Sequence, residues 1–392
     1  MRVLLMTDWT AERGGVEIYL TQLRRGLEAV GVETRLLVSS VGEGARTADY
    51  VARGSDRALV QSLSQLVNPV AVRAVRSAVR EFRPDIVHVS GFELQLSPAV
   101  FSALNGIPSV VNVAWTKPVC PTGHKLLPDG ALCQQRWGTA CHQHGCVRGV
   151  RWAREMARYR MITAALRSAS AIVTCSNHMH NLLTSHGLTS LVVDWPVLPP
   201  GPGFSRSRAA QPVFVAVGRL SQEKGIEMLL AAVAQIRVGG IDARLRLVGD
   251  GPQRASIEHL ATQLGIGDVV EITGWVEHDA VEGYLQDAWA LVAPSLWAEP
   301  LGLSAVEAIV RGVPVVASAV GGYAETVESG VTGLLCANGD VIALIGCLGD
   351  VARGRAFGDG TLADDAIERL ASRHALDRHV EALVGVFSEV SR

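Results

Sequence analysis

The sequence predicts an α/β protein with two similar halves, each a doubly wound parallel sheet with crossover helices. Short apolar runs alternate with helix-length segments along most of the chain, as in parallel strands joined by helices. A segment with four prolines in nine residues, Trp195 to Gly203, interrupts this alternation near the middle. The alternation then begins again, which favours two Rossmann-like domains that face a central cleft.

Apolar runs predict six strands in the first half and five in the second, with helical patterns such as 16–30 and 70–82 between them. A last periodic stretch, from residue 375 to 387, predicts a terminal helix. The predicted domains are 1–195 and 213–372, joined by a linker at 196–212, with a final helix at 373–392. The strands are expected at 3–7, 34–39, 85–90, 108–113, 171–176 and 191–194, then at 213–217, 244–248, 269–273, 290–293 and 314–317.

Length and composition limit the class of protein. A chain of 392 residues with 48% hydrophobic and 19% charged residues can build two cores. The formal net charge of −2 argues against a general attraction to nucleic acid. The chain contains no apolar run of the roughly 18 residues that a membrane span needs, and it enters a strand directly rather than a signal peptide. We therefore expect a cytoplasmic protein.

The most informative segment runs from Pro294 to Ala308 and holds two carboxylates, Glu299 and Glu307, around the start of a helix. A carboxylate in the loop can accept hydrogen bonds from sugar hydroxyls. The helix N-terminus offers unpaired backbone N–H groups and a positive dipole end, which suit a phosphate. The pattern therefore predicts a nucleotide-sugar site.

Two cations follow the strand at 213–217. Arg219 and Lys224 would lie near the carboxyl edge of the sheet, where open α/β sheets bind ligands, and would neutralise a diphosphate. Solvated surface charges are the alternative. Val276 lies in the turn after the predicted strand at 269–273 and could contact a base through its backbone. The alternative is that this turn only packs its aromatic residue, Trp275, against the domain.

These motifs resemble the retaining nucleotide-sugar glycosyltransferases of family 4, which have the two-domain GT-B fold. The resemblance covers most of the chain, in order and spacing. It rests on 14–17 (Gly-Gly-Val-Glu), 218–220 (Gly-Arg-Leu), 223–225 (Glu-Lys-Gly), 249–252 (Gly-Asp-Gly-Pro), 299–308 (Glu-x7-Glu-Ala), 312–317 (Gly-Val-Pro-Val-Val-Ala) and 332–335 (Thr-Gly-Leu-Leu).

The resemblance implies a role for each matched residue. Glu299, Arg219 and Lys224 would be catalytic, because the cations take the charge of the departing diphosphate while Glu299 holds sugar hydroxyls. Such enzymes need no cofactor for the chemistry, and the departing diphosphate can act as the base. The remaining donor-binding residues would be Gly15, Val276, Leu301, Gly302, Leu303 and Glu307, with a UDP-sugar as the donor.

The first domain departs from the family at residues 114 and 115. Relatives place a histidine and an aspartate where this chain has Ala114 and Trp115. That histidine is thought to touch the donor sugar near its C6 hydroxyl. One hypothesis is a donor that lacks this hydroxyl.

A nucleotide-sugar epimerase and a binding protein that no longer catalyses are the alternatives to a transferase.

Four cysteines, Cys120, Cys133, Cys141 and Cys146, lie in a loop-like insert at about 116–147. Clustered thiols in a reducing compartment indicate a structural zinc ion, with reduced thiols and disulfides as alternatives.

Arginines recur at helical spacing at 148, 151, 154 and 158. They predict either a solvated helix face or contact with an anionic acceptor or lipid head groups at a membrane surface.

Overall fold

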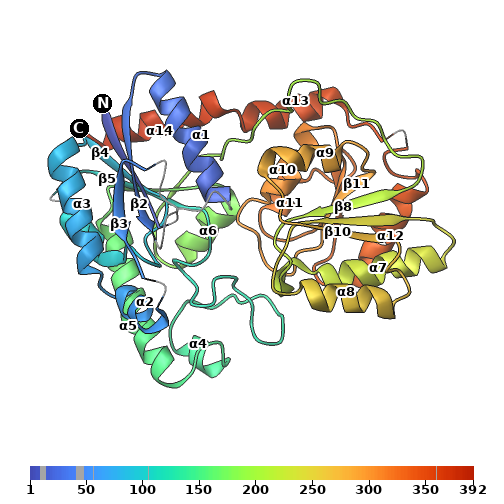
Figure 1. Ribbon diagram of the computed structural model, residues 1–392, viewed down its shortest axis with the longest axis horizontal. Coiled ribbons are helices and arrows are strands. Elements are labelled where there is room, and N and C mark those ends of the chain that lie inside the picture. The colour runs from blue at the N-terminus through green and yellow to red at the C-terminus, as the bar shows by residue number, and fades with distance from the viewer. Residues whose placement is uncertain (9–14, 41–47, 56, 105, 359) are drawn as a thin grey trace. The chain divides into compact units, whose positions relative to one another are not determined.

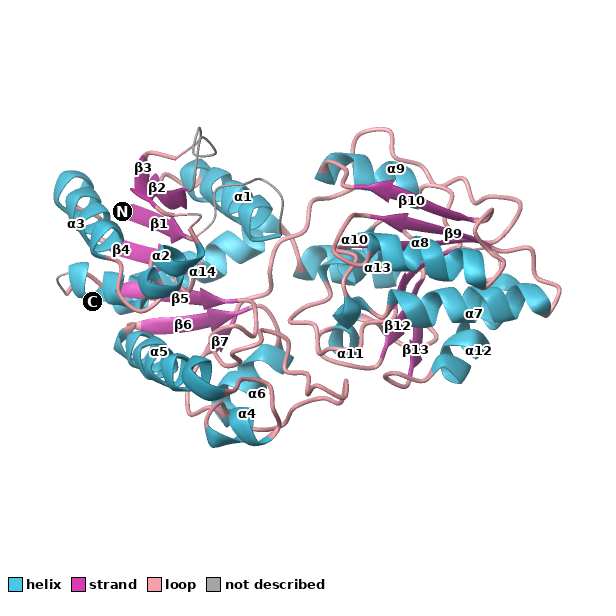
Figure 2. Cartoon of the chain, turned by 60° about the horizontal axis from the view of Figure 1, so that its bottom comes forward, coloured by secondary structure: helices cyan, strands magenta, loops and turns pink. Residues whose placement is uncertain are grey.

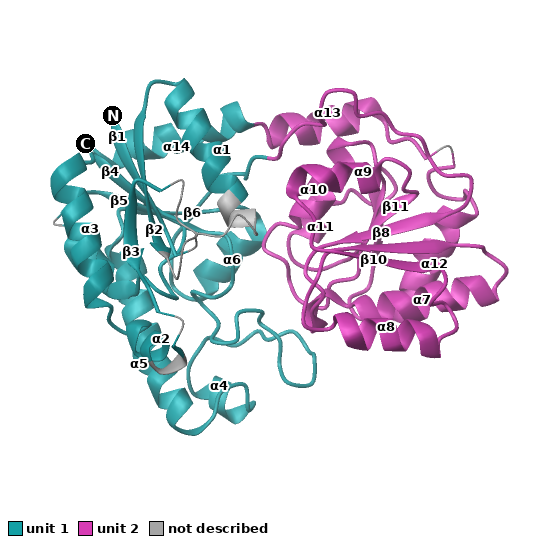
Figure 3. Ribbon diagram, in the orientation of Figure 1, with its two compact units in different colours: residues 1–196, 376–392 teal, residues 197–375 magenta. Residues whose placement is uncertain are grey.

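The computed structural model describes residues 1–8, 15–40, 48–55, 57–104, 106–358 and 360–392. The chain divides into two compact units. Unit 1 comprises Met1–Pro196 and Leu376–Arg392, and unit 2 comprises Val197–Ala375 (Figure 3). Each unit is a parallel sheet with helices on both faces (Figure 2), so the predicted fold class is confirmed.

Unit 1 contains a seven-stranded parallel sheet in the order β3-β2-β1-β4-β5-β6-β7. Its central strand β1 is almost entirely buried, because helices cover both faces and its side chains are apolar on both. The strands are β1 (Arg2–Thr7), β2 (Glu33–Ser40), β3 (Tyr50–Arg53), β4 (Ile86–Val89), β5 (Ser109–Val113), β6 (Ala171–Thr174) and β7 (Leu191–Val192).

In unit 1, α1 and α14 pack together on one face of the sheet, while α3, η1 and α5 lie on the other (Figure 1). Helix α3 begins where Asn68 accepts hydrogen bonds from the backbone N–H groups of Val70 and Ala71, with a proline at the first helical position. The helices are α1 (Gly15–Ala29), α2 (Ala58–Ser64), α3 (Pro69–Phe82), η1 (Pro98–Ala103), α4 (Thr139–Gln143), α5 (Gly149–Ser168), α6 (Asn177–Ser185) and α14 (Leu376–Val390).

The last helix, α14, is anchored to unit 1 by a buried aromatic cluster. His379 lies within hydrogen-bonding distance of the Tyr19 hydroxyl, at 3.1 Å, and of the Asp194 carbonyl, at 2.7 Å. Tyr19 also stacks on Trp195, with 4.3 Å between ring centroids. Burial lowers the pKa of the neighbouring His88 to about 3, so this imidazole is neutral at pH 7.

Unit 2 contains a six-stranded parallel sheet in the order β10-β9-β8-β11-β12-β13. Helices α7, α8 and α12 lie on one face, and α9, α10, α11 and α13 on the other (Figure 1). The strands are β8 (Val213–Val217), β9 (Arg244–Val248), β10 (Val270–Gly274), β11 (Ala290–Ala293), β12 (Val315–Ser318) and β13 (Gly333–Cys336). The helices are η2 (Gln222–Lys224), α7 (Ile226–Val238), α8 (Arg254–Gln263), η3 (His278–Ala280), α9 (Val281–Leu285), α10 (Leu303–Val310), α11 (Tyr323–Thr326), α12 (Val341–Ala352) and α13 (Asp364–Arg373).

The apolar pattern missed two edge strands, β3 and β13. Strand β3 has only four residues, of which only Ala52 is buried, and β13 begins at a glycine after a turn. Short edge strands bury little side-chain surface, so their pattern is weak. The segment 196–212, predicted as a linker, is hydrogen-bonded along unit 2, for instance from Ser207 N to Gln286 O at 3.0 Å.

Among the described helices, none combines the length and apolar character required to cross a bilayer.

Candidate donor site in unit 2

The predicted donor residues gather at the carboxyl edge of the unit 2 sheet, at its topological switch point. Strand β8 pairs with β9 on one side and with β11 on the other, so the loops after β8 and β11 diverge above the sheet. In open α/β sheets ligands bind in the crevice at such a point. Lys224 is in the loop after β8, and Glu299 is in the loop after β11.

These two loops are fastened to each other. The backbone N–H of Leu296 donates to the carbonyl of Glu223 at 2.9 Å. Gly225 has a φ of 66°, and a Cβ there would lie 2.1 Å from the Pro294 carbonyl oxygen. Only glycine fits this approach, so the glycine of the Glu-Lys-Gly motif brings the lysine up to the carboxylate.

One oxygen of Glu299 receives three donors. Lys224 Nζ forms an ion pair with Glu299 Oε1, and Ser295 Oγ and Trp297 Nε1 donate to the same atom at 3.1 and 2.9 Å. Oε2 accepts no hydrogen bond from the described part of the chain. Because Glu299 is only 8% exposed, this arrangement fixes the carboxylate and leaves one oxygen to accept from a ligand hydroxyl.

Lys224 keeps its charge at this site. Burial lowers its pKa, but the Glu299 carboxylate, and then Tyr323, more than offset this, so the pKa stands above the ordinary value. Burial and then Glu299 raise the pKa of Tyr323 to about 12, which keeps the phenol neutral. The Lys224 cation can bind anionic oxygens, and the available Oε2 of Glu299 can accept from a hydroxyl. Together they can bind a ligand that carries both kinds of group.

The N-terminus of α10 follows directly. Gly302 precedes it with a φ of 78°, and a Cβ there would lie 2.5 Å from the Tyr323 ring. Gly321 and Gly322 approach the backbone of 299–301 equally closely, and Gly322 N donates to Glu299 O at 2.7 Å. The loop is therefore held rigidly. The N–H groups of Leu303 and Ser304 lie in the first helical turn, which has no intrahelical acceptors, at the positive end of the dipole.

Glu307 lies one turn further along α10 and is 9% exposed. Its Oε1 is 3.3 Å from Nε2 of His278, which lies in η3 after β10. Burial raises the pKa of Glu307, and His278 and then Arg311 oppose this shift. Val276 is half-buried in the turn before His278. Glu307 therefore faces His278 in η3, the short helix that follows β10.

One predicted donor residue of unit 2, Arg219, is not brought into this group, and another, Gly15, belongs to unit 1. Arg219 is exposed and forms no hydrogen bond or ion pair through its side chain with the described residues. Gly15 is the first residue of α1, and its motif partner Gly14 lies outside the described residues. Their roles remain predictions. Sequence reasoning missed the side chains of Ser295, Trp297, His278 and Tyr323, although the first two lie inside the segment it singled out.

Unit 1 holds a second charged group at the matching switch point, between β1 and β4. Asp8, after β1, accepts hydrogen bonds from the backbone N–H groups of residues 94, 95 and 96 at 2.6–2.8 Å. Glu93, after β4, is 2% exposed, and burial followed by the Asp8 charge raises its pKa to about 7. Trp115 Nε1 donates to Glu93 Oε1 at 3.4 Å, so the tryptophan contacts this carboxyl.

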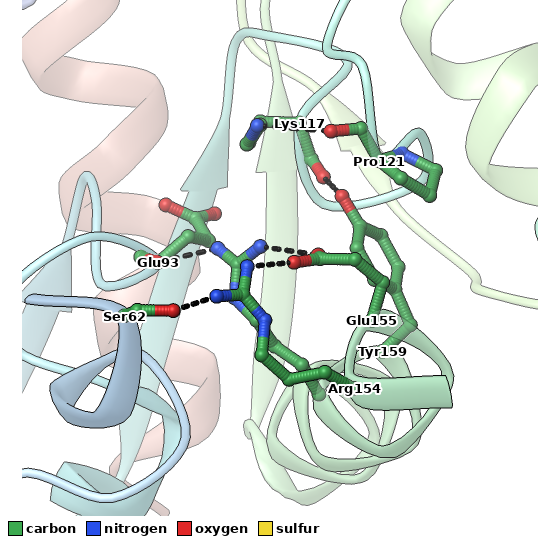
Figure 4. Close-up of polar contacts among 8 residues, drawn as sticks. Ser62, Glu93, Lys117, Pro121, Arg154, Glu155 and Tyr159 are labelled. Atoms are coloured by element: carbon green, nitrogen blue, oxygen red, sulfur yellow. Dashed lines mark hydrogen bonds and ion pairs between the residues drawn. The ribbon is translucent and has the colours of Figure 1, made fainter. Parts of the chain in front are cut away.

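The basic helix α5 corrects a prediction. Arg158 is 1% exposed and donates to Glu155 Oε2 at 2.9 Å and to the Glu93 carbonyl. Arg154 pairs with Glu155 and Ser62 (Figure 4). The prediction of a solvated helix face is therefore wrong for Arg158, whereas Arg154 is only partly buried and contact with an anionic acceptor or a membrane surface stays a prediction. Helical spacing places residues on one face, but it does not say that this face points inward to compensate buried carboxylates.

The four insert cysteines are free thiols. Across the described residues no three His, Cys, Asp or Glu side chains stand in metal-ligating positions.

Two parallel-sheet α/β units are the architecture of a class of glycosyltransferases, and comparisons with known proteins agree. A family model described as Glycosyltransferase Family 4 matches residues 13–201, and one described as Glycosyl transferases group 1 matches 203–351. The chain is 31% identical to a 2-deoxystreptamine N-acetyl-D-glucosaminyltransferase of Streptomyces fradiae, over 96% of this chain and 92% of that one. This chain belongs to the family 4, group 1 glycosyltransferases.

A second relative and two solved structures extend the comparison. A 2-deoxystreptamine glucosyltransferase of Streptomyces kanamyceticus is 34% identical over 46% of this chain and 50% of its own length. Sucrose-phosphate synthase from Thermosynechococcus elongatus superposes with a TM-score of 0.72 at 23% identity, covering 100% of this chain and 99% of that one. Anabaena HepE in complex with UDP-glucose gives 0.70 at 18%, covering 99% and 100%. These likenesses establish the GT-B fold.

Proposed function

We propose that the protein is a retaining glycosyltransferase that moves a sugar from a UDP-sugar to an acceptor hydroxyl. The observation that carries the proposal is the Lys224–Glu299 pair at the unit 2 switch point. Lys224 and the first-turn amides of α10 supply positive charge for a diphosphate. Glu299 Oε2 supplies an acceptor for a sugar hydroxyl. Structural neighbours solved in complex with UDP and with UDP-glucose support this donor class.

Within this reaction the chain's residues bind and orient. Glu299 fixes the sugar, Glu307 accepts from the ribose, and Lys224 with Arg219 balances the charge that grows on the departing diphosphate. The reaction needs no carboxylate nucleophile, because Glu299 Oε1 accepts from three donors and Oε2 binds a sugar hydroxyl. The departing diphosphate takes the proton of the acceptor hydroxyl, and attack on the same face retains configuration.

We further propose an aminocyclitol as the acceptor class, because two relatives carry 2-deoxystreptamine in their names. Ala114 and Trp115 stand where the family has a histidine and an aspartate. We propose that they suit a donor sugar without a C6 hydroxyl. If Ala114→His does not change donor preference, this part is withdrawn.

The test is acceptor-dependent release of UDP from a panel of UDP-sugars, with the anomeric configuration of the product read by NMR. Glu299→Gln should abolish most turnover, while Glu368→Gln, an exposed glutamate on α13, should match the wild type. UDP release without acceptor, interconversion of the donor sugar, or an inverted product would each contradict the proposal.

A further inference from the structure

The cysteine-bearing insert after β5 has no apolar core of its own. From Thr122 to Cys146 the structure describes every residue, and Lys125 is the only buried one. Ordering a backbone costs about 1–2 kcal/mol per residue, which a domain normally offsets by burying apolar side chains. Apolar side chains in this segment, such as Leu126, Leu127 and Trp137, are only partly buried, so they offset that cost only in part.

The insert is nevertheless folded, in two small pieces. The first is a hairpin, in which Cys133 N donates to Lys125 O at 2.7 Å and Leu127 N to Ala131 O at 2.8 Å. The second is α4, after which Val147 N returns to Cys141 O at 3.0 Å. Cys120 precedes the hairpin and Cys133 lies in its second arm, while Cys141 lies in α4 and Cys146 follows it. Each piece therefore presents one pair of thiols.

All four thiols border one small cavity. Cys120, Cys133, Cys141 and Cys146 line a space of about 20 Å³, which has room for a single water-sized sphere. Four mutually close, partly buried thiols are electrostatically unfavourable as thiolates unless a cation lies among them.

We propose that Cys120, Cys133, Cys141 and Cys146 bind one Zn²⁺ as thiolates, and that this ion orders the insert. Binding releases the four thiol protons to solvent and involves no change of oxidation state. Four sulfur ligands in a closed site are the arrangement of structural zinc. Binding would require the four side chains to rotate toward the ion, because no three of them stand in ligating positions in the described part of the chain. His144 also lines the cavity but is not needed as a ligand.

The experiment uses full-length protein, purified without a histidine tag or chelator. Elemental analysis should find one zinc per chain, and a mercurial reagent should release it into a chromogenic chelator. Cys133→Ser and Cys141→Ser should each lower the zinc content at least fivefold. Cys347→Ser, a half-buried cysteine in unit 2, and His144→Ala should retain it.

Exchange with Co²⁺ gives a readout that does not depend on the variants folding. Wild-type protein should show thiolate-to-cobalt charge transfer and the visible bands of tetrahedral cobalt. Less than a tenth of an equivalent of zinc together with no cobalt spectrum overturns the proposal. So does the loss of thiols that only a reductant restores, because that indicates disulfides. None of these readouts requires transferase activity, so this proposal and the proposed function can fail separately.

Discussion

The two units place charged side chains at the same topological position and use them differently. In unit 1, Asp8 and Glu93 follow β1 and β4, and they are closed in by backbone amides, Trp115 and Arg158. In unit 2, Lys224 and Glu299 follow β8 and β11, and Glu299 keeps one oxygen free of partners among the described residues. The Asp8 carboxylate holds a loop, whereas Lys224 and Glu299 form the candidate donor site.

The difference shows that charged residues at a topological switch point do not by themselves make a ligand site. Both carboxylate oxygens of Asp8 accept hydrogen bonds from the backbone of residues 94–96, so Asp8 holds the loop after β4 in place. In unit 2, by contrast, Gly225, Gly321 and Gly322 let the loops around Glu299 approach each other closely, because these glycines have no side chains to fill the space between the loops. Three predictions test this contrast.

The largest effect is expected for Arg158→Met. Removing this buried guanidinium leaves the Glu155 carboxylate, and the carboxyl of Glu93 beside it, without their buried cation. The free energy of unfolding should fall by about 3–5 kcal/mol, measured by urea denaturation at pH 7. The exposed Arg151→Met should stay within about 0.5 kcal/mol of the wild type. A loss below 1 kcal/mol at Arg158 would mean that this network is not structural.

The next effect is expected for Lys224→Ala, which removes the cation from the unit 2 site. Under the proposed function, kcat/KM should fall by about 10²–10³, because charge developing on the diphosphate loses its fixed partner. The control is Arg355→Ala, whose side chain is 68% exposed, and its kcat/KM should be unchanged. A loss of stability at Lys224 as large as that at Arg158, with kcat/KM intact, would erase the contrast between the units.

The smallest effect concerns the pH dependence of Glu93. Its pKa is raised from 4.5 to about 7, so between these values the folded state holds a proton that the unfolded state has lost. The free energy of unfolding should therefore decrease as pH rises through this window, by at most about 1.4 kcal/mol per pH unit. Glu93→Gln should remove that slope, as measured by chemical denaturation from pH 4.5 to 8. An unchanged slope would show that Glu93 is ionised throughout.

Much of the fold could be read from the sequence, because long buried strands and their helices carry strong apolar patterns. The central strands β1 and β8 were predicted within one residue of their observed bounds. Edge strands β3 and β13 were not, since few of their side chains are buried. The candidate donor residues at 299, 307 and 224 could be singled out because glycines and charges at fixed spacing mark the loops after β8 and β11.

Sequence by itself determined the alternation of strands and helices, the two units and the chemistry available at Glu299 and Lys224. Only the tertiary structure decided which charges are partnered. It turned Arg158 inward to a buried carboxylate and gathered Ser295 and Trp297 onto one oxygen of Glu299. The reason is physical: periodicity in the chain specifies which residues share a face, whereas the direction of that face depends on burial and on charges from distant segments.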